Sequence, residues 1–144
     1  MEQALNSNRR LDLIGRAAAA AAAAAALAAI FIVWKYDPNL STFYPTCPLY
    51  RLTGYACPGC GMTRGLHALL HGDLLASLDY NAMLLPVLIL LAYIWWSSVL
   101  YAAKGHVVKP TKFMVWFLWS LLVALLAFGV LRNLPFAPFN WLFP

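Results

Sequence analysis

Residues 113–131 read FMVWFLWSLLVALLAFGVL, a run without a charged side chain that lies between Lys112 and Arg132. An α-helix needs about 20 mainly apolar residues to cross the hydrocarbon core of a bilayer, because each residue advances it by about 1.5 Å. The run therefore predicts a membrane span. Trp116 and Trp119, near its start, are of the type enriched at membrane interfaces.

Two further stretches, 17–34 and 82–101, have the same length and apolar character. The composition agrees, since 63% of the residues are hydrophobic and 10% are charged. A soluble domain needs more polar surface than this, so we predict an all-α membrane protein with three transmembrane helices. We expect one membrane domain over residues 1–144, with connections at 35–81 and 102–112 and tails at 1–16 and 132–144.

The first predicted span is dominated by alanine. The alternative is a secretory signal peptide, but the run exceeds the typical apolar region of about 7–15 residues. Small side chains let helix backbones approach closely in a membrane. We therefore expect this helix to pack tightly against another span.

Positive charges predict how the chain crosses the membrane. They gather in the tail 1–16 and the connection 102–112, namely at Arg9, Arg10, Arg16, Lys104, Lys109 and Lys112. The connection 35–81 balances its cations with aspartates. The positive-inside rule puts 1–16 and 102–112 in the cytoplasm, and 35–81 and the tail 132–144 outside. The net charge of +5 is dispersed, so we predict the lipid bilayer as partner and no nucleic acid.

The outer connection should contain a short amphipathic helix. At 100° per residue, Met62 and Leu66 share one side of a helix over about 61–71, while His67 and His71 lie on the other. Projecting the helix back one turn places Cys60 on the histidine side. Pro58 suits a first helical position, and Asp73 suits the N-cap of a second short helix. We expect the segment to lie along the outer membrane interface.

The connection also holds every cysteine of the chain, Cys47, Cys57 and Cys60. One interpretation is structural. Disulfides persist in an outer, oxidising compartment. A bond from Cys47 to Cys57 or Cys60 would stabilise the folded chain by about 3 kcal/mol in the loop-entropy model. One thiol would then remain unpaired.

A second interpretation is redox. A C-x-x-C motif at a helix N-terminus is typical of dithiol oxidoreductases, because the helix dipole stabilises a thiolate. Cys57 and Cys60 would form the redox pair, with Cys47 as a relay thiol. Arg64 and a protonated His67 would favour the thiolate further. The βαβ pattern that usually surrounds this motif is missing from the sequence.

A third interpretation is a metal site, because CPGCG is also typical of half of a zinc or iron knuckle. Three cysteines with His67 or His71 would supply a Cys₃His set for zinc, and copper(I) is a softer alternative. However, Cys60 and His67 stand two helical turns apart, about 10 Å along the axis. The spacing alone leaves the three interpretations open.

The stretch from Cys47 to Pro86 resembles an uncharacterised family of small bacterial membrane proteins, a domain of unknown function. The resemblance rests on Cys-Pro, then G-x-x-C-P-G-C-G-x-T-R, Gly-Asp and Tyr-Asn in this order. It implies a bacterial inner-membrane protein without a known activity. It also adds further candidate site residues, namely Thr63, Arg64, Asp73, Tyr80 and Asn81.

Together these patterns favour a small, non-catalytic membrane protein. Its outer cysteine-containing segment would organise the helix bundle or dock another membrane protein or a second copy. A Ser-His-Asp set, a phosphate loop and a carboxylate pair are all missing from the sequence. A thiol–disulfide redox protein and a metal-binding protein are the alternatives, so whether the chain is an enzyme stays open.

Overall fold

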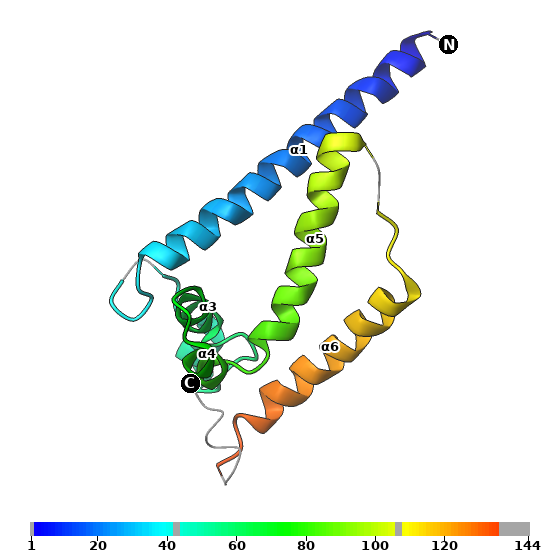
Figure 1. The fold of residues 1–144 in the computed structure, drawn as a ribbon. Helices are drawn as coiled ribbons and strands as arrows, with labels where there is room; N and C mark the ends of the chain where they lie inside the picture. The colour runs from blue at the N-terminus through cyan, green and yellow to red at the C-terminus, as the bar shows by residue number, and fades with distance from the viewer. Residues whose placement is uncertain (1, 42–43, 106–107, 136–144) are drawn as a thin grey trace.

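The computed structural model describes residues 2–41, 44–105 and 108–135, and side chains from residue 9 onward within those ranges. Over these ranges the chain is helical and has no strand (Figure 1). The helices are α1 (Glu2–Lys35), α2 (Pro48–Thr53), α3 (Met62–Leu70), α4 (Leu74–Tyr80), α5 (Leu84–Lys104) and α6 (Lys112–Leu131). Most of the expected tail 132–144 lies outside the described residues.

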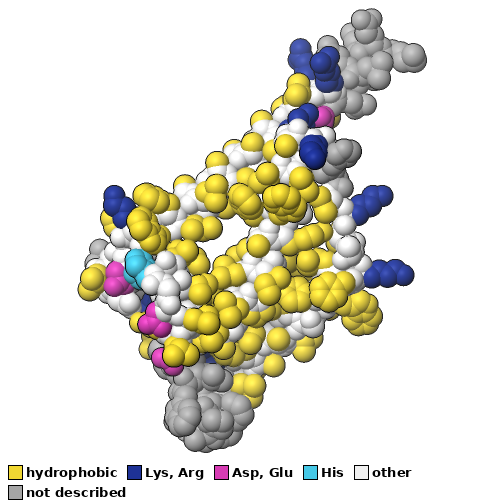
Figure 2. Space-filling view, in the orientation of Figure 1, with side chains coloured by type: hydrophobic (Ala, Val, Ile, Leu, Met, Phe, Trp, Pro, Cys, Tyr) yellow, Lys and Arg dark blue, Asp and Glu magenta, His cyan; other side chains and the backbone are white. Residues whose placement is uncertain are grey.

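Three of the helices are long and apolar enough to cross a membrane: Arg9–Lys35 within α1, α5 and α6. This confirms the all-α class with three candidate spans. α1 begins well before residue 17, so much of the expected tail 1–16 continues the same helix. Hydrophobic side chains cover the surface of the long helices (Figure 2), as lipid contact requires.

α1 packs mainly on α5, along a contact that we call the α1–α5 seam. Ala23 of α1 is buried there, and its carbonyl accepts a hydrogen bond from Trp95 Nε1 at 3.1 Å. Arg16 donates from Nε to Ala102 O at 3.0 Å and from Nη2 to Ala103 O at 2.9 Å. These are carbonyls of the last turn of α5, which lack partners inside the helix. α1 thus contacts α5 through Arg16 and Ala23, whereas most of its alanines are exposed, so the close packing expected of the whole alanine run is limited to this contact.

α6 leans away from α5 toward its Lys112 end (Figure 1). Thr111 caps that end, since its hydroxyl accepts the Met114 amide at 3.2 Å. The other end of α6 approaches the cysteine segment. A Cβ atom on Gly129 would lie 3.2 Å from Cδ of Pro58, so glycine permits this contact. α6 is therefore positioned chiefly through its C-terminal end.

The segment between α1 and α5 forms three short helices. α3 matches the expected amphipathic helix, and Asp73 caps α4 as predicted, accepting the Ala76 amide at 2.9 Å. α2 was not expected.

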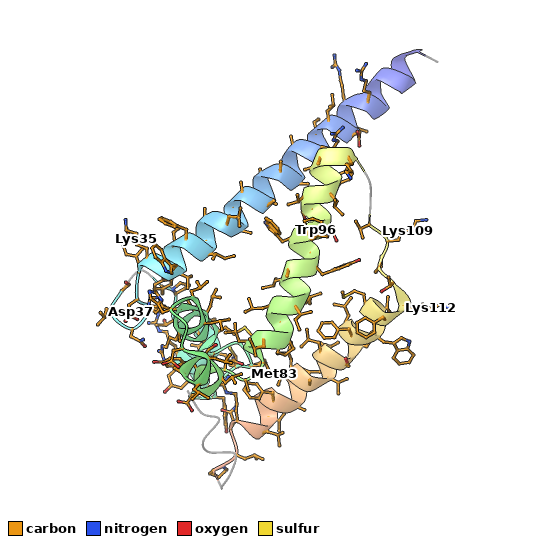
Figure 3. The ribbon with its side chains drawn as sticks, viewed as in Figure 1. Lys35, Asp37, Met83, Trp96, Lys109 and Lys112 are labelled. Atoms are coloured by element: carbon orange, nitrogen blue, oxygen red, sulfur yellow. The ribbon has the colours of Figure 1, made fainter. Side chains whose placement is uncertain are left out.

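The short helices lie at one end of the molecule. Lys35 and Asp37 lie at this end, whereas Lys109 and Lys112 lie at the other (Figure 3). We call the two ends the cysteine end and the lysine end.

Candidate functional site

The three cysteines converge at the cysteine end. Cys47 stands at the N-cap of α2, and Cys57 and Cys60 belong to the turn that precedes α3. Their Sγ atoms all lie within 4.8 Å of one another, and those of Cys57 and Cys60 are 3.2 Å apart. Each side chain is partly buried. We call Cys47 together with residues 56–61 the cysteine cap.

The structural interpretation expected a disulfide from Cys47 to Cys57 or Cys60, and this expectation is wrong. All three cysteines are free thiols. A disulfide needs sulfurs about 2.05 Å apart, whereas the contact between Cys57 and Cys60 is a thiol–thiol contact at 3.2 Å. Three sulfurs share one small volume, so the arrangement is a cluster and not a covalent pair with one thiol left over.

The CPGC turn closes before α3 begins. The Cys60 amide donates to Cys57 O at 3.0 Å, and Gly61 follows with φ of 87°, a left-handed conformation that favours glycine. Pro58 is therefore not a first helical residue, because the helix starts only at Met62. As a consequence, Cys60 is not part of the α3 face that carries the histidines.

Two buried side chains bind the carbonyls of this turn. Asn81, just before α5, donates from Nδ2 to Pro58 O at 2.9 Å and to Cys60 O at 3.0 Å. Arg132, at the end of α6, donates from Nη1 to Cys57 O at 3.0 Å and to Cys60 O at 3.1 Å. Each is only 1% exposed. The backbone of the cap is thus oriented by both α5 and α6.

Asn133 completes the connection between α6 and the cap. Its Oδ1 accepts the Ala56 amide at 2.8 Å, and its Nδ2 donates to Ala56 O at 2.8 Å and to Gly129 O at 2.7 Å. The two bonds to Ala56 resemble a pair of backbone hydrogen bonds, and they fix the segment that leads into Cys57. Ala56 is itself buried.

The thiols differ in acidity. The backbone amide of Tyr50, followed by the Cys57 thiol, lowers the pKa of Cys47 to about 7. Burial, followed by the thiols of Cys57 and Cys47, raises the pKa of Cys60 to about 12. The physical reason is that the Tyr50 amide stabilises the charged form of Cys47, whereas burial penalises the charged form of Cys60. Cys47 is therefore the more readily ionised of the two.

Arg132 brings a positive charge to the cluster. Burial lowers its pKa, and the negative charge that Cys60 and Cys57 would carry when ionised opposes this shift. Its guanidinium also lies over the ring of Phe128, 4.9 Å from the centroid. Sequence reasoning had treated Arg132 only as a charge beyond the last span. A basic residue there is ordinary in membrane proteins, so no local signal in the sequence marks its contact with the cysteines.

The two histidines lie apart from the three sulfurs, against the end of α1. His67 Nδ1 is 2.6 Å from Val33 O, and His71 Nδ1 is 2.9 Å from His67 O. Their ring centroids are 4.3 Å apart, and the His71 ring stacks on Trp34 at 6.2 Å. The structure thus brings together the three cysteines, but it uses the histidines to connect α3 to α1.

The remaining candidates divide into one residue within the site and several outside it. Asn81 binds the CPGC turn, as described above. Asp73 caps α4, and Tyr80 is its last residue, packed beside Gly65. Thr63 and Arg64 are exposed on α3. Asn81 was identified through the family resemblance, whereas Arg132 and Asn133 were missed.

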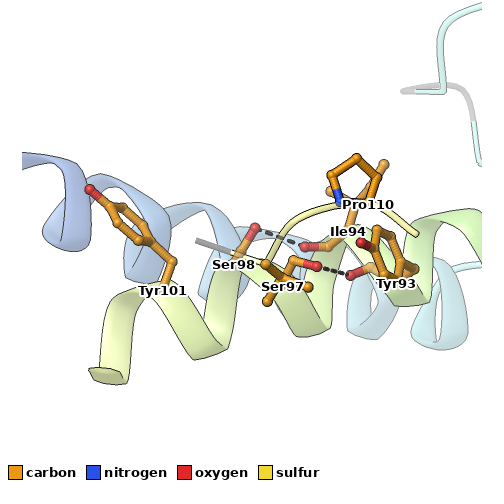
Figure 4. A pocket seen from close by; sticks show the side chains of 7 residues that line it. Tyr93, Ile94, Ser97, Ser98, Tyr101 and Pro110 are labelled. Atoms are coloured by element: carbon orange, nitrogen blue, oxygen red, sulfur yellow. Dashed lines mark hydrogen bonds between the residues drawn. The ribbon is translucent and has the colours of Figure 1, made fainter. Parts of the chain in front are cut away.

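A hollow of about 460 Å³ lies on α5 at the lysine end, and it is mainly apolar (Figure 4). Ser97 and Ser98 line it, but their hydroxyls donate to carbonyls of their own helix, Tyr93 O at 2.8 Å and Ile94 O at 2.9 Å. The buried hydroxyl of Tyr93, which also lines the hollow, has no hydrogen-bond partner among the described residues. The hollow thus offers one unpaired hydroxyl, whereas the cysteine cap gathers three thiols. The cysteine cap is the better candidate site.

Comparison with known proteins gives a match for one segment of the chain. No match was found among the curated proteins or among the solved structures. One family model matches, and its match begins at Cys47, includes all three cysteines and Asn81, and ends before Arg132. Residues 47–95 thus match the family described as a protein of unknown function (DUF2752), which confirms the resemblance to an uncharacterised family over this segment.

Proposed function

We propose that this chain is a small, non-catalytic integral membrane protein whose cysteine cap binds a thiophilic metal ion and thereby organises the helix bundle. One observation carries the proposal: the sulfur of Cys47 and the two sulfurs of the CPGC turn lie within 4.8 Å of one another. Zinc is the first candidate, and iron or copper(I) are also thiophilic. Cys47, Cys57 and Cys60 are the ligands.

The spacing of the sulfurs suits such an ion. A tetrahedral zinc site has Zn–S bonds of about 2.3 Å, which puts neighbouring sulfurs about 3.8 Å apart. The sulfurs of Cys57 and Cys60 are 3.2 Å apart and all three lie within 4.8 Å of one another, so no separation exceeds this value by more than about 1 Å. Small side-chain rotations are therefore enough to close the site. The fourth position is left for water or for a ligand from a partner.

The same cap connects the spans, which is why a bound ion would organise the bundle. Asn81 connects the CPGC turn to α5, and Arg132 and Asn133 connect the cap to α6. An ion that joins Cys47 to this turn would add α2 to the same assembly. Because metal binding is coupled to folding, its free energy would stabilise the whole connection.

The membrane setting follows from the charges. We place the lysine end in the cytoplasm and the cysteine end outside a bacterial inner membrane, since Lys104, Lys109 and Lys112 surround the connection between α5 and α6. The exposed apolar helices favour lipid as the principal partner. A second membrane protein or a second copy would contact the cap at the open metal position.

A second candidate function is thiol–disulfide exchange, favoured by the 3.2 Å contact between Cys57 and Cys60. In this reaction the two thiols would form a disulfide and pass two electrons and two protons to a partner disulfide, which becomes a dithiol. Cys47, with its pKa lowered to about 7, would attack the partner disulfide as a thiolate and release one partner thiol. Cys57 would then displace the second partner thiol from Cys47, and Cys60 would displace Cys47 from Cys57, which leaves the Cys57–Cys60 disulfide.

One experiment separates the two functions. The full chain is purified in detergent without chelator, bound metal is measured by mass spectrometry, and free thiols are counted by alkylation before and after mild reductant. About one metal ion per chain, with thiols that become reactive after chelation, would support the metal site. A metal-free protein with a disulfide reducible by glutathione would support exchange. A metal-free protein with three permanently free thiols would contradict both.

A further inference from the structure

Two hollows lie along one face of α5. The first is the hollow of about 460 Å³ at the lysine end (Figure 4). The second, of about 470 Å³, lies between α5 and α6 and is lined by hydrophobic side chains. Leu90 lines the second hollow, and Ile94 and Tyr101 line the first. Because these residues follow the helical repeat, they share a face of α5. We call the two hollows together the α5 groove.

The dimensions of the α5 groove suit a single apolar chain. Each helical residue rises about 1.5 Å, so the groove measures about 16 Å from Leu90 to Tyr101. This is about half of the hydrocarbon core of a bilayer, which is about 30 Å thick. Each hollow also has the volume of a ligand pocket, about 300–1,000 Å³. α6 leans away from α5 toward this end (Figure 1), so the described part of the chain does not fill the groove.

The groove contains one unpaired hydrogen-bond donor. Three of the hydroxyls that line it are engaged, since Ser97 and Ser98 donate within α5 and Tyr101 donates to Asp12 Oδ1 at 3.5 Å. The buried hydroxyl of Tyr93 has no partner among the described residues. A buried hydroxyl without a partner is unfavourable. An occupant that brings an oxygen acceptor would satisfy it.

Positive charges surround the lysine end of the groove. Lys109 stands between Val108 and Pro110, which line the first hollow. Lys104 ends α5 and Lys112 begins α6, and the connection between these helices contains no acidic residue. Lys109 and Lys112 lie beside this connection (Figure 3). The charges therefore favour an occupant whose polar end is negative.

We propose that the α5 groove binds one anionic glycerophospholipid from the bilayer. An acyl chain lies along α5, the phosphate lies near Lys109, and an oxygen of the lipid accepts a hydrogen bond from Tyr93. A free phosphate ion would leave the apolar groove empty, and a zwitterionic lipid would gain less from the lysines. This site is separate from the cysteine cap, so it does not depend on the proposed metal function.

The test uses the full chain in detergent, stripped of bound lipid, and native mass spectrometry with added phosphatidylglycerol or phosphatidylcholine of the same acyl chains. We expect one phosphatidylglycerol per chain, bound about 10-fold more tightly than phosphatidylcholine. Lys109→Gln should weaken binding of phosphatidylglycerol about 5-fold and leave that of phosphatidylcholine unchanged. Tyr93→Phe should weaken binding of both lipids about 5-fold, because both carry the oxygen acceptor.

Lys35→Gln is the matched control, because Lys35 is exposed at the cysteine end and its loss should change neither affinity. Equal affinities of the wild-type chain for the two lipids would overturn the proposal, and so would Lys109→Gln and Tyr93→Phe chains that bind as the wild type does. A dimer that binds no lipid would also overturn it, since a second copy would then occupy the groove. If a variant fails to fold, the wild-type comparison of the two lipids decides.

Discussion

The cysteine end and the lysine end are held together by different means. At the lysine end, α1 and α5 lie against each other, and Arg16 bonds the last carbonyls of α5. At the cysteine end, side chains from α5 and α6 converge on one irregular turn. Helices in a membrane gain little from hydrophobic burial against one another, so packing and hydrogen bonds decide their arrangement. The comparison teaches that α6 depends on the cap, whereas α1 and α5 associate without it.

The largest effect is expected on Zn²⁺ affinity when a metal ligand is removed. Structural zinc binding is worth about 10–16 kcal/mol over four ligands, so Cys57→Ser should weaken Zn²⁺ binding about 100-fold or more. Competition with a chelator of known affinity measures this in the detergent-solubilised chain. His67→Ala should bind Zn²⁺ normally, because His67 contacts Val33 and not the sulfurs. Equal losses in the two variants would mean that the histidine belongs to the site.

The next effect concerns the connection between the cap and α5. Asn81→Ala leaves Pro58 O without its bond from Asn81 and should lower the free energy of unfolding by about 1–3 kcal/mol. Chemical denaturation in mixed micelles measures it. Asn39→Ala is the control, because Asn39 is exposed and bonds only to Asp37 within its own turn in the described structure. A change in stability as small as that of the control would show that the cap does not hold α5.

A smaller effect is expected at the lysine end. Arg16→Ala removes two partly exposed hydrogen bonds to α5 and should lower the free energy of unfolding by about 1 kcal/mol. Zn²⁺ affinity should not change, since the substitution is remote from the cap. Arg10→Ala, on an exposed part of α1, should have neither effect. If Arg16→Ala weakened metal binding, the two ends would be coupled and the comparison would fail.

The smallest effect is a difference between thiols in the metal-free chain. Cys47, with its pKa lowered to about 7, should react with iodoacetamide at a rate that rises with pH through a midpoint near 7. Cys60, with its pKa raised to about 12, should stay slow across that range. Because the pKa of Cys47 is lowered on folding, the stability from its thiolate is complete above pH 9 and is lost as the pH falls through 7.

Peptide-resolved mass spectrometry follows each cysteine separately in this experiment. The unfolded chain in denaturant is the control, and there Cys47 should show an ordinary midpoint near 9. Identical profiles for Cys47 in the folded and unfolded chains would show that the Tyr50 amide does not stabilise its thiolate.

The sequence by itself determined the local features. Apolar length predicted the three spans, and Asp73 predicted the start of α4, because caps depend on neighbouring residues. The CPGC spacing marked the segment where the cysteines gather, but it left the structural, redox and metal interpretations open. The prediction that Cys60 shares the histidine side of the helix was wrong, because Gly61 in a left-handed conformation ends the turn before the helix begins.

Only the tertiary structure decided which groups meet. Cys47 lies beside the other cysteines because α2 and the chain after it turn back toward Cys47. Arg132, far along the chain at the end of α6, donates to the carbonyl of Cys57. The histidines share the periodicity of α3 but contact α1 instead. Hydropathy and spacing describe each helix alone, whereas these contacts depend on how helices separated in sequence lie together, and this is set by packing and by the need to pair buried polar groups.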